Sequence, residues 1–550
     1  TGALVLQQWP EAAMVMVLFT IAELIEARSL DRARNAIRGL MQLAPSQATV
    51  QQADASWQAM PASDVVPGAS VRVGPGERIA LDGTIVRGQS SIDQAPITGE
   101  SLPVDKGVGD AVFAGTISGA GGFDYRVTAA ANDSQLARII HAVEDAQGKK
   151  APTQRFVDKF ARIYTPVVVA VALAVAVLPP LLLGGAWWDW VYKALVLLVI
   201  ACPCALVIST PVTIVSGLAA AARKGILVKG GAFLEQGRTL RWLALDKTGT
   251  LTLGKPAQTV YESAPGVSDD LTQSRRRAAS LAARSDHPVS RAIAQAAQAD
   301  DIETMEVSDF RAVPGQGVQG VVDGLALSVG NHRMVHDLGF CTPVLEARLE
   351  HLERQGNSVV MLVDPQRVIA LFAVADTVKP GSRAAIAAIH ALGIRTVMLT
   401  GDNPHTAQAI AQAVGITEVR GNQLPEDKLA AVSALAGQGV VGMVGDGIND
   451  APALARADIG FAMGALGTDT AIETADVALM DDDLNKLAAF VRLSQATHRI
   501  LVQNIVLAVG IKLVFLVLTV VGLGTMWMAV FADVGASLLV VANGLRVMRK

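Results

Sequence analysis

The sequence predicts a multidomain membrane protein in which a bundle of transmembrane α-helices carries two large polar insertions. The chain has 550 residues, 51% of them hydrophobic, and its mean hydropathy of +0.39 is too high for an ordinary soluble protein. Five apolar runs are long enough to cross roughly 30 Å of hydrocarbon. The first insertion has the alternating patterns of a small β-rich domain. In the second, short apolar strands end in aspartate-containing loops, which is typical of a doubly wound α/β sheet.

The predicted membrane helices follow from the apolar runs. They are Ala3 to Ile25, Val167 to Leu183, Ala194 to Ala222, Ile500 to Val521 and Met526 to Leu545. Lys and Arg gather at one end of these runs, for example at Arg28 to Arg38 and Lys149 to Arg162. The other ends have almost no charged residues. Because basic flanks stay in the cytoplasm, both insertions are predicted to be cytoplasmic. The chain begins without Met, inside its first apolar run, and we expect further sequence upstream.

Charge and cysteine content narrow the possible functions. The formal net charge is −4, which gives no electrostatic support for a nucleic-acid partner. Of the three cysteines, Cys202 and Cys204 lie too close together within one apolar segment for a plausible disulfide, which indicates reducing surroundings for the soluble parts. Cys341 is interpreted as an ordinary small side chain.

The most informative stretch is Asp-Lys-Thr-Gly-Thr at residues 246–250, which follows the apolar residues of a predicted buried strand. A carboxylate there can attack a phosphoryl group when charge is neutralised nearby. Two other strands run into Thr-Gly-Asp at 400–402 and Gly-Asp-Gly-Ile-Asn-Asp at 445–450. Since ligands bind beyond the carboxyl ends of such strands, we expect the three loops to converge. Their carboxylates would repel one another, which predicts a hard cation, Mg²⁺. A solvated Asp in a turn is the alternative for Asp246.

These motifs resemble those of the P-type ATPases, and Thr-Gly-Glu-Ser at residues 98–101 completes the set in the expected order. The resemblance covers nearly the whole chain. It implies an actuator domain (residues 45–148) and a doubly wound α/β phosphorylation domain (229–254 and 374–486) that carries an inserted α/β nucleotide-binding domain (255–373). Membrane helices would lie in the remaining segments, residues 1–44, 149–228 and 487–550. Heavy-metal pumps of this family carry eight membrane helices, so three further helices, and often a metal-binding domain, would precede this chain.

The resemblance also implies roles for individual residues. Asp246 would be phosphorylated by ATP, Lys428 would neutralise the phosphoryl charge, and Glu100 would position the water that hydrolyses the aspartyl phosphate. The other residues of this site are Lys247, Thr248, Thr400 and Asp402, and Mg²⁺ would be held by Asp246, Thr248 and Asp446, with Asp450 nearby. The nucleotide would lie against His287, Gly315, Gly317, Gly330 and Asn331. Without this context, His287 and the glycines would be read as ordinary surface and loop residues.

A second candidate site lies inside the membrane. Pro203 breaks the third apolar run between Cys202 and Cys204, and two thiols beside freed backbone carbonyls suit a soft metal ion. The alternative is that both cysteines are small packing residues. Lys512 and Asp533 lie in the last two spans, where an ionisable residue costs roughly 2.5–3.5 kcal/mol unless it is paired or functional. One interpretation is a structural salt bridge between them. The other is that Asp533 is a metal ligand and Lys512 is its counter-ion.

Charge balance selects the transported ion. Two thiolates, one carboxylate and one ammonium leave a charge that a divalent cation neutralises. Thiolate and carboxylate together suit Zn²⁺, and the sulfurs also accept Cd²⁺ and Pb²⁺. The pattern of Cys-Pro-Cys with Lys512 and Asp533 is also similar to that of zinc, cadmium and lead exporters, a subgroup of the heavy-metal (CPx) pumps. Glu11 and Glu23 in the first span are candidates for metal release and uptake, and either Glu alternatively faces other helices or water.

We therefore predict ATP-driven export of Zn²⁺, and also of Cd²⁺ and Pb²⁺, through an aspartyl-phosphate intermediate, with a Cu⁺-exporting P-type ATPase as the alternative. ATP and Mg²⁺ are the expected cofactors. The expected partners are the lipid bilayer and the metal ion, with no nucleic acid, and the protein is expected to work as a monomer in a bacterial inner membrane. A membrane-anchored phosphatase would not need the intramembrane Cys, Lys and Asp residues, and a passive channel or sensor would not need Asp246.

Overall fold

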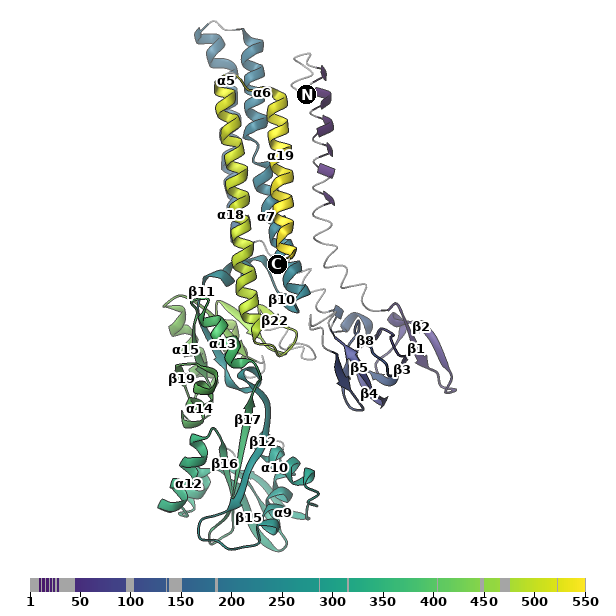
Figure 1. The fold of residues 1–550 in the computed structure, drawn as a ribbon, viewed down its shortest axis with the longest axis vertical. Helices are drawn as coiled ribbons and strands as arrows, with labels where there is room; N and C mark the ends of the chain where they lie inside the picture. The colour runs from purple at the N-terminus through teal and green to yellow at the C-terminus, as the bar shows by residue number, and fades with distance from the viewer. Residues whose placement is uncertain are drawn as a thin grey trace.

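The structure of the protein is a computed structural model that describes most of the chain. The described residues are 45–94, 103–134, 151–183, 186–285, 287–313, 316–402, 404–445, 450–464, 475–521 and 523–549, with shorter pieces between 9 and 28 and at 136–137. Figure 1 shows a column of long helices above an α/β unit, a second unit of sheet and helices below that one, and a β-rich unit to the side. This arrangement agrees with the predicted fold class.

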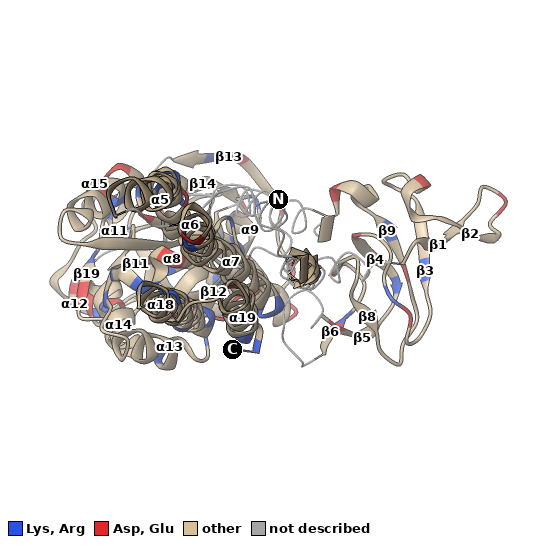
Figure 2. Cartoon of the chain, turned by 90° about the horizontal axis from the view of Figure 1, so that it is seen from above, with Lys and Arg blue, Asp and Glu red and all other residues tan. Residues whose placement is uncertain are grey.

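The column consists of the apolar runs. Four helical segments of the described residues are long and apolar enough to span a membrane: Pro152–Leu182, Trp187–Arg223, Asn485–Thr519 and Met526–Arg549. They comprise helices α5 (Pro152–Leu183), α6 (Trp187–Ala201), α7 (Cys204–Arg223), α18 (Asn485–Val520) and α19 (Met526–Leu545). These helices are neighbours in two views, one across the column (Figure 1) and one along it from above (Figure 2). The first predicted span, Ala3 to Ile25, is described only in short helical pieces between residues 9 and 24.

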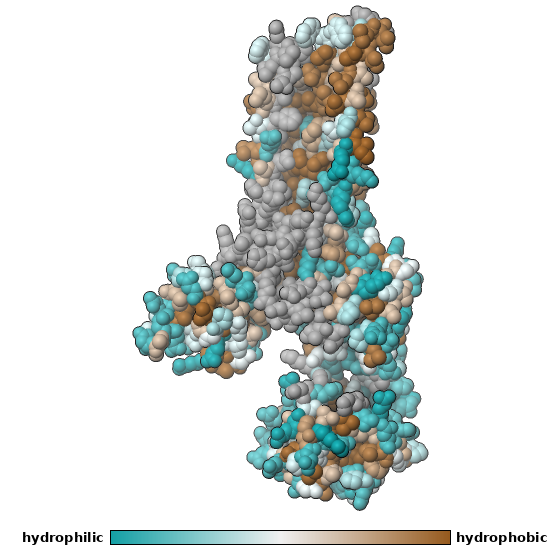
Figure 3. All heavy atoms as spheres, turned by 180° about the vertical axis from the view of Figure 1, so that it is seen from behind, coloured by the Kyte–Doolittle hydropathy of each residue, from teal (hydrophilic) through white to brown (hydrophobic). Residues whose placement is uncertain are grey.

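The outer surface of the column is apolar. Along α18, Val506, Val509, Leu513 and Val517 are between 53% and 65% exposed. In Figure 3, apolar residues gather along the right side of the upper part of the molecule, whereas more polar residues show on the units below. Such a surface would be unfavourable in water, and it is the surface that a lipid bilayer covers.

The β-rich unit follows from short strands with alternating buried and exposed residues, such as β3. Its larger sheet has the order β2-β1-β3-β9-β4-β7, and a smaller sheet has the order β6-β5-β8. Their bounds are β1 (Gln47–Gln51), β2 (Trp57–Pro61), β3 (Ser70–Val73), β4 (Gly83–Gly88), β5 (Ser90–Asp93), β6 (Val104–Lys106), β7 (Ala111–Val112), β8 (Ile117–Ser118) and β9 (Phe123–Val127). Tyr125 is fully buried in the core, where its hydroxyl accepts a 3.3 Å hydrogen bond from the Leu81 amide.

The α/β unit directly below the column is a doubly wound sheet. Its strand order is β10-β22-β21-β20-β11-β18-β19, and β11 pairs in parallel with both β18 and β20. The strands are β10 (Ile226–Val228), β11 (Leu240–Asp246), β18 (Arg395–Leu399), β19 (Glu418–Arg420), β20 (Val440–Gly445), β21 (Ile459–Ala462) and β22 (Val477–Leu479). The flanking helices are α8 (Gly231–Gln236), α13 (Ser382–His390), α14 (Pro404–Val414), α15 (Pro425–Ala436) and α16 (Ala451–Arg456). Three aspartate-bearing loops therefore follow neighbouring parallel strands, as the sequence predicted.

The lowest unit interrupts this sheet. Its strands pair antiparallel in the order β12-β17-β16-β15-β14-β13, and the chain enters through β12 and returns through β17 beside it. The strands are β12 (Thr252–Ser263), β13 (Val307–Val313), β14 (Gly317–Val322), β15 (Leu325–Gly330), β16 (Ser358–Val363) and β17 (Val368–Val378). The helices packed against them are α9 (Leu271–Ala282), α10 (Pro288–Ala299), α11 (His332–Asp337) and α12 (Pro343–Arg354).

Helix α18 extends from the column onto the doubly wound unit. The Ser494 hydroxyl donates a hydrogen bond to the Leu234 carbonyl, and the Phe490 ring stacks edge-on against Phe461 with ring centroids 5.4 Å apart. Gly237 is required at this contact, because a Cβ there would lie 2.5 Å from the Phe490 ring. One buried apolar cluster thus joins the membrane column to the unit that carries Asp246.

Candidate phosphorylation and metal-transport sites

Asp246 is the last residue of β11, and its backbone pairs in parallel with Leu399 of β18. Its buried carboxylate lies beyond the carboxyl end of the sheet, and Oδ1 accepts a 2.6 Å hydrogen bond from Lys428 Nζ, near the start of α15. The same ammonium donates a 2.7 Å hydrogen bond to Asp450 Oδ1. Lys428 therefore holds two carboxylates from different loops around a single positive charge.

This environment keeps Lys428 protonated. Burial of the ammonium by itself lowers the pKa of Lys428, but the carboxylates of Asp246 and Asp450 outweigh that effect and raise the pKa above its usual value. From the sequence alone, the repulsion between these carboxylates predicts a metal ion. The structure adds that the Lys428 ammonium already relieves part of it.

Lys247 connects a second pair of loops. Its Nζ donates a 2.5 Å hydrogen bond to Asp402 Oδ2, and the Asp402 amide in turn donates a 3.1 Å hydrogen bond to Thr400 Oγ1. Lys247 and Thr400 are buried, whereas Thr248 is exposed. The structure thus brings six of the predicted residues to one edge of the sheet: Asp246, Lys247, Thr400, Asp402, Lys428 and Asp450. Thr248 lies in the same loop with its side chain accessible to a ligand.

Lys379 is a positioning residue that sequence reasoning did not identify. Its buried Nζ donates a 2.6 Å hydrogen bond to the Gly249 carbonyl and lies 3.2 Å from Asp482 Oδ1. Gly249 has a φ of +70°, a left-handed conformation that favours glycine, so Lys379 holds the turn that directly follows the candidate nucleophile. The available sequence signal was weak: a lysine directly after the long strand β17.

Several predicted site residues cannot be placed. Glu100, Asp446, Gly315 and Glu11 lie outside the described residues. Glu23 is described, and its side chain is exposed in a helical segment. The roles predicted for these residues stay predictions.

The predicted nucleotide residues fall into two groups. Gly317 and Gly330 face each other across β14 and β15, and the Asn331 amide donates a 2.9 Å hydrogen bond to the Gln316 carbonyl. Close packing explains both glycines, because a Cβ at Gly330 would lie 2.3 Å from Met334 Sδ and one at Gly317 would lie 2.2 Å from a backbone oxygen. His287 belongs to a different element. It is the N-cap of α10, where its exposed ring Nδ1 accepts a hydrogen bond from the Val289 amide.

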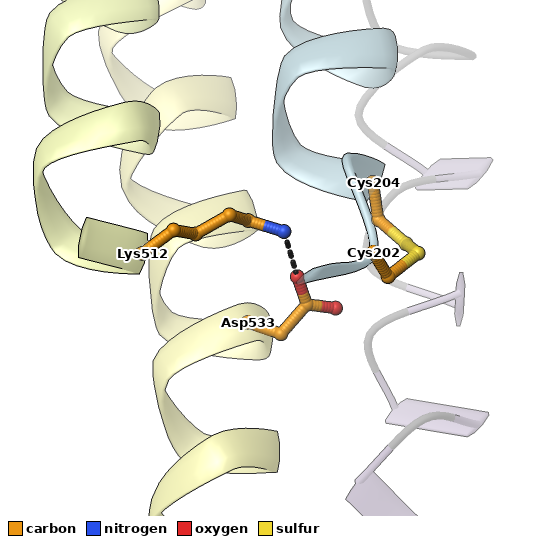
Figure 4. The surroundings of a disulfide bond; sticks show 4 residues. All are labelled: Cys202, Cys204, Lys512 and Asp533. Atoms are coloured by element: carbon orange, nitrogen blue, oxygen red, sulfur yellow. Dashed lines mark hydrogen bonds and ion pairs between the residues drawn. A yellow bond between two sulfur atoms is a disulfide. The ribbon is translucent and has the colours of Figure 1, made fainter. Parts of the chain in front are cut away.

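The membrane motif breaks the helix as expected. Helix α6 ends at Ala201, and α7 begins at Cys204, with Pro203 between them. Cys202 and Cys204 form a disulfide with an S–S distance of 2.14 Å (Figure 4). The prediction that residues so close together form no disulfide was wrong: the break at Pro203 lets the chain turn so that both side chains point the same way. After reduction, the same turn presents two sulfur donors side by side.

Lys512 and Asp533 lie at the same level of the column. Lys512 Nζ in α18 donates a 2.9 Å hydrogen bond to Asp533 Oδ1 in α19, and the two side chains point toward each other in Figure 4. A cavity of about 210 Å³ lies beside Lys512, and Pro203 also lines it. The rest of that lining is apolar or aromatic: Phe160, Tyr164, Ile200, Ala201, Leu206, Ala508, Val509, Leu513 and Leu516.

Comparisons with known proteins agree with this architecture. Residues 42–144 match the P-type ATPase actuator domain, and residues 240–458 match the haloacid dehalogenase-like hydrolase family. The cadmium-transporting ATPase of Staphylococcus aureus is 44% identical over 557 residues, which cover 100% of this chain and 76% of that protein. The zinc/cadmium/lead-transporting P-type ATPase of Escherichia coli is 42% identical over 552 residues, which cover 100% of this chain and 74% of that protein.

A solved structure is similar as well. The crystal structure of a zinc-transporting PIB-type ATPase in its E2.Pi state is 41% identical in sequence and superposes with a TM-score of 0.65, covering 100% of this chain and 89% of that one. The family and the fold class predicted from the motifs are thereby confirmed. The chain belongs to the heavy-metal-transporting P-type ATPases.

Proposed function

We propose that this protein exports Zn²⁺, and also Cd²⁺ and Pb²⁺, from the cytosol by hydrolysing ATP. The observation that carries the proposal is the presence, in one chain, of a buried Asp246–Lys428–Asp450 cluster and of a Lys512–Asp533 ion pair inside the membrane column. The first arrangement suits phosphoryl transfer, and the second suits a charged cargo. The names of the cadmium and the zinc/cadmium/lead transporters among its relatives support the same group of ions.

In the proposed phosphorylation step, an oxygen of the Asp246 carboxylate attacks the γ-phosphorus of ATP. A bond forms between that oxygen and phosphorus, the bond to the bridging oxygen breaks, and ADP leaves. Lys428 is already within 2.6 Å of the Asp246 carboxylate, so its ammonium is in place to neutralise the phosphoryl charge. We assign the later attack of water to activation by Glu100.

The oxygen donors at this site fit Mg²⁺. Asp246 and Asp450 offer carboxylates, which are the hard ligands that this ion prefers. We assign the ion to Asp246, Thr248 and Asp446, with Asp450 beside it. When bound, it would neutralise charge on the phosphoryl oxygens. The proposed nucleotide contacts are His287, Gly315, Gly317, Gly330 and Asn331.

We assign the transported ion to Cys202, Cys204 and Asp533, with Lys512 as counter-ion. In the reduced protein, two thiolates, one carboxylate and one ammonium would be neutralised by a divalent ion, and sulfur with oxygen donors suits Zn²⁺ and Cd²⁺. The ion pair between Lys512 and Asp533 gives the carboxylate a partner whenever the metal is absent. Glu23 and Glu11 are proposed to serve metal uptake and release.

The protein is an integral membrane protein, and we place it in a bacterial inner membrane with its large domains in the cytoplasm. The decisive test is ATP hydrolysis by purified, reduced protein with Zn²⁺, Cd²⁺, Pb²⁺, Cu⁺ and Co²⁺ added in turn. We expect stimulation by the first three ions, and the Asp246→Asn variant corrects for contaminating ATPases. Stimulation by Cu⁺ alone would overturn the assignment of the cargo.

A further inference from the structure

Three potential metal ligands meet in the nucleotide-binding unit, away from the membrane column. His332 is the first residue of α11, Cys341 lies in the link after it, and Glu346 lies in the first turn of α12. One ligand atom from each, an imidazole nitrogen, a sulfur and a carboxylate oxygen, lies within 4.8 Å of the other two. The proposed transport cycle uses none of these residues, and the sequence alone predicts only an ordinary small side chain for Cys341.

The backbone around these donors is held by a packed core. Val335 of α11 and Leu345 of α12 are buried in one apolar cluster, and Cys341 packs against its edge. The Phe340 amide donates a 3.1 Å hydrogen bond to the Val335 carbonyl, and Thr342 Oγ1 caps α12 by accepting from the Leu345 amide. The donors thus stand on a rigid base, which reduces the entropy lost when they close on an ion.

The chemistry of the donors favours a particular class of ion. Thiolate and imidazole ligands suit Zn²⁺ and Cd²⁺ and are poor ligands for Mg²⁺ or Ca²⁺. In a tetrahedral zinc site with bonds of about 2.0–2.3 Å, neighbouring donors are roughly 3.3–3.8 Å apart, so small side-chain rotations suffice here. With Cys341 deprotonated, the donors carry the charge that a divalent cation neutralises. His332 and Glu346 are exposed, which leaves a path for the ion and a position for water.

We propose that His332, Cys341 and Glu346 form a second metal site, on the cytosolic nucleotide-binding unit, for a divalent ion of the Zn²⁺ and Cd²⁺ class. The site is separate from the transport pathway. An ion bound there would tie the start of α11 to α12. Because His332 directly follows Asn331, which caps α11 by accepting from the Met334 amide, the ion would also restrain the loop at the end of β15.

The test uses the 550-residue chain with Cys202→Ser and Cys204→Ser, in which Cys341 is the only remaining thiol. Cd²⁺ alone is titrated, and the thiolate-to-Cd²⁺ charge-transfer band in the ultraviolet reports binding at Cys341. We expect a band that saturates at one ion per chain. Adding His332→Ala or Glu346→Gln should weaken Cd²⁺ binding at least about tenfold, since even outer-shell partners of a metal typically contribute 10–100-fold.

Matched controls lie on the same helices. His336→Ala on α11 and Glu350→Gln on α12 remove exposed side chains of the same types and should leave the Cd²⁺ affinity unchanged. Thermal unfolding of each variant verifies that the unit is folded. The proposal fails if no band forms, or if His332→Ala and Glu346→Gln bind Cd²⁺ as tightly as the controls do, because a lone thiol would then account for binding. ATP hydrolysis is not measured, so the outcome does not depend on the transport function.

Discussion

The Lys512 ammonium donates a 2.9 Å hydrogen bond to the Asp533 carboxylate, which joins α18 to α19 inside the membrane column. The side chain of Asp533 is only 5% exposed and that of Lys512 18% exposed. Removing one partner from a buried ion pair leaves the other charge uncompensated, which typically costs about 3–5 kcal/mol. A cation that binds Asp533 must therefore replace Lys512 as the partner of its carboxylate. Lys512 must pair with that carboxylate again when the cation leaves.

Replacing Lys512 should act mainly on metal release. In Lys512→Ala, Asp533 has no partner after the ion departs, so we expect slower release and slower dephosphorylation, with a smaller effect on initial metal binding. Metal release from preloaded protein and phosphoenzyme decay measure these steps, and Lys512→Arg serves as the control that keeps the charge. If binding collapses while release and turnover rates stay normal, Lys512 organises the loaded site instead.

Phosphorylation should depend on the carboxylate of Asp246. Asp246→Asn removes the nucleophile, and we expect no acid-stable phosphate after incubation with labelled ATP. Glu100→Gln should still trap phosphate and lose it more slowly, because only the attack of water is affected. Trapped phosphate in the Asp246→Asn protein would contradict the assignment.

Removing the positive charge of Lys428 should destabilise the phosphorylation unit. In Lys428→Met the carboxylates of Asp246 and Asp450 remain buried without their shared ammonium, and we expect a loss of about 3–5 kcal/mol in free energy of unfolding. Lys428→Arg retains the charge and should lose less. Hydrogen exchange of the amides in this unit measures the free energy of unfolding of each variant. Equal stability of Lys428→Met and wild type would refute the prediction.

The ion pairs of Lys428 also predict how the free energy of unfolding depends on pH. The folded state raises the pKa of Lys428, so its stabilising contribution is complete below the pKa of an unfolded lysine, about 10.4, and is lost as the pH rises through the higher folded value. The stability difference between wild type and Lys428→Met should therefore stay constant from neutral pH to about pH 10 and shrink above it. A difference that already shrinks near pH 8 would show that another group titrates.

The Cys202, Cys204 and Asp533 side chains should be needed for metal-dependent turnover. Each Ala variant should lose metal stimulation while its cytosolic units unfold at the wild-type temperature, because these residues lie in the column and not in those units. Metal bound per chain under reducing conditions is the companion measurement. If all three variants bind as much metal per chain as the wild type, these residues are packing residues and not metal ligands.

Local patterns in the sequence determined most of the architecture. Apolar runs predicted the spanning helices, alternating residues predicted the β-rich unit, and the strand before Asp246 predicted a parallel sheet. Lys512 and Asp533 stood out because charged residues are rare in apolar runs. These inferences succeed because hydrophobic burial and helix or strand periodicity depend on residues close together in the chain.

Only the tertiary structure decided which distant side chains meet. Lys428 reaches Asp246 across 182 positions of sequence, and Lys379 reaches the Gly249 carbonyl across 130. No periodic signal encodes such contacts, because they depend on strand order and on the packing of helices against the sheet. The same holds for the bond between Cys202 and Cys204, which required the backbone turn at Pro203. It holds also for the His332, Cys341 and Glu346 cluster, whose members converge because α11 and α12 share one core.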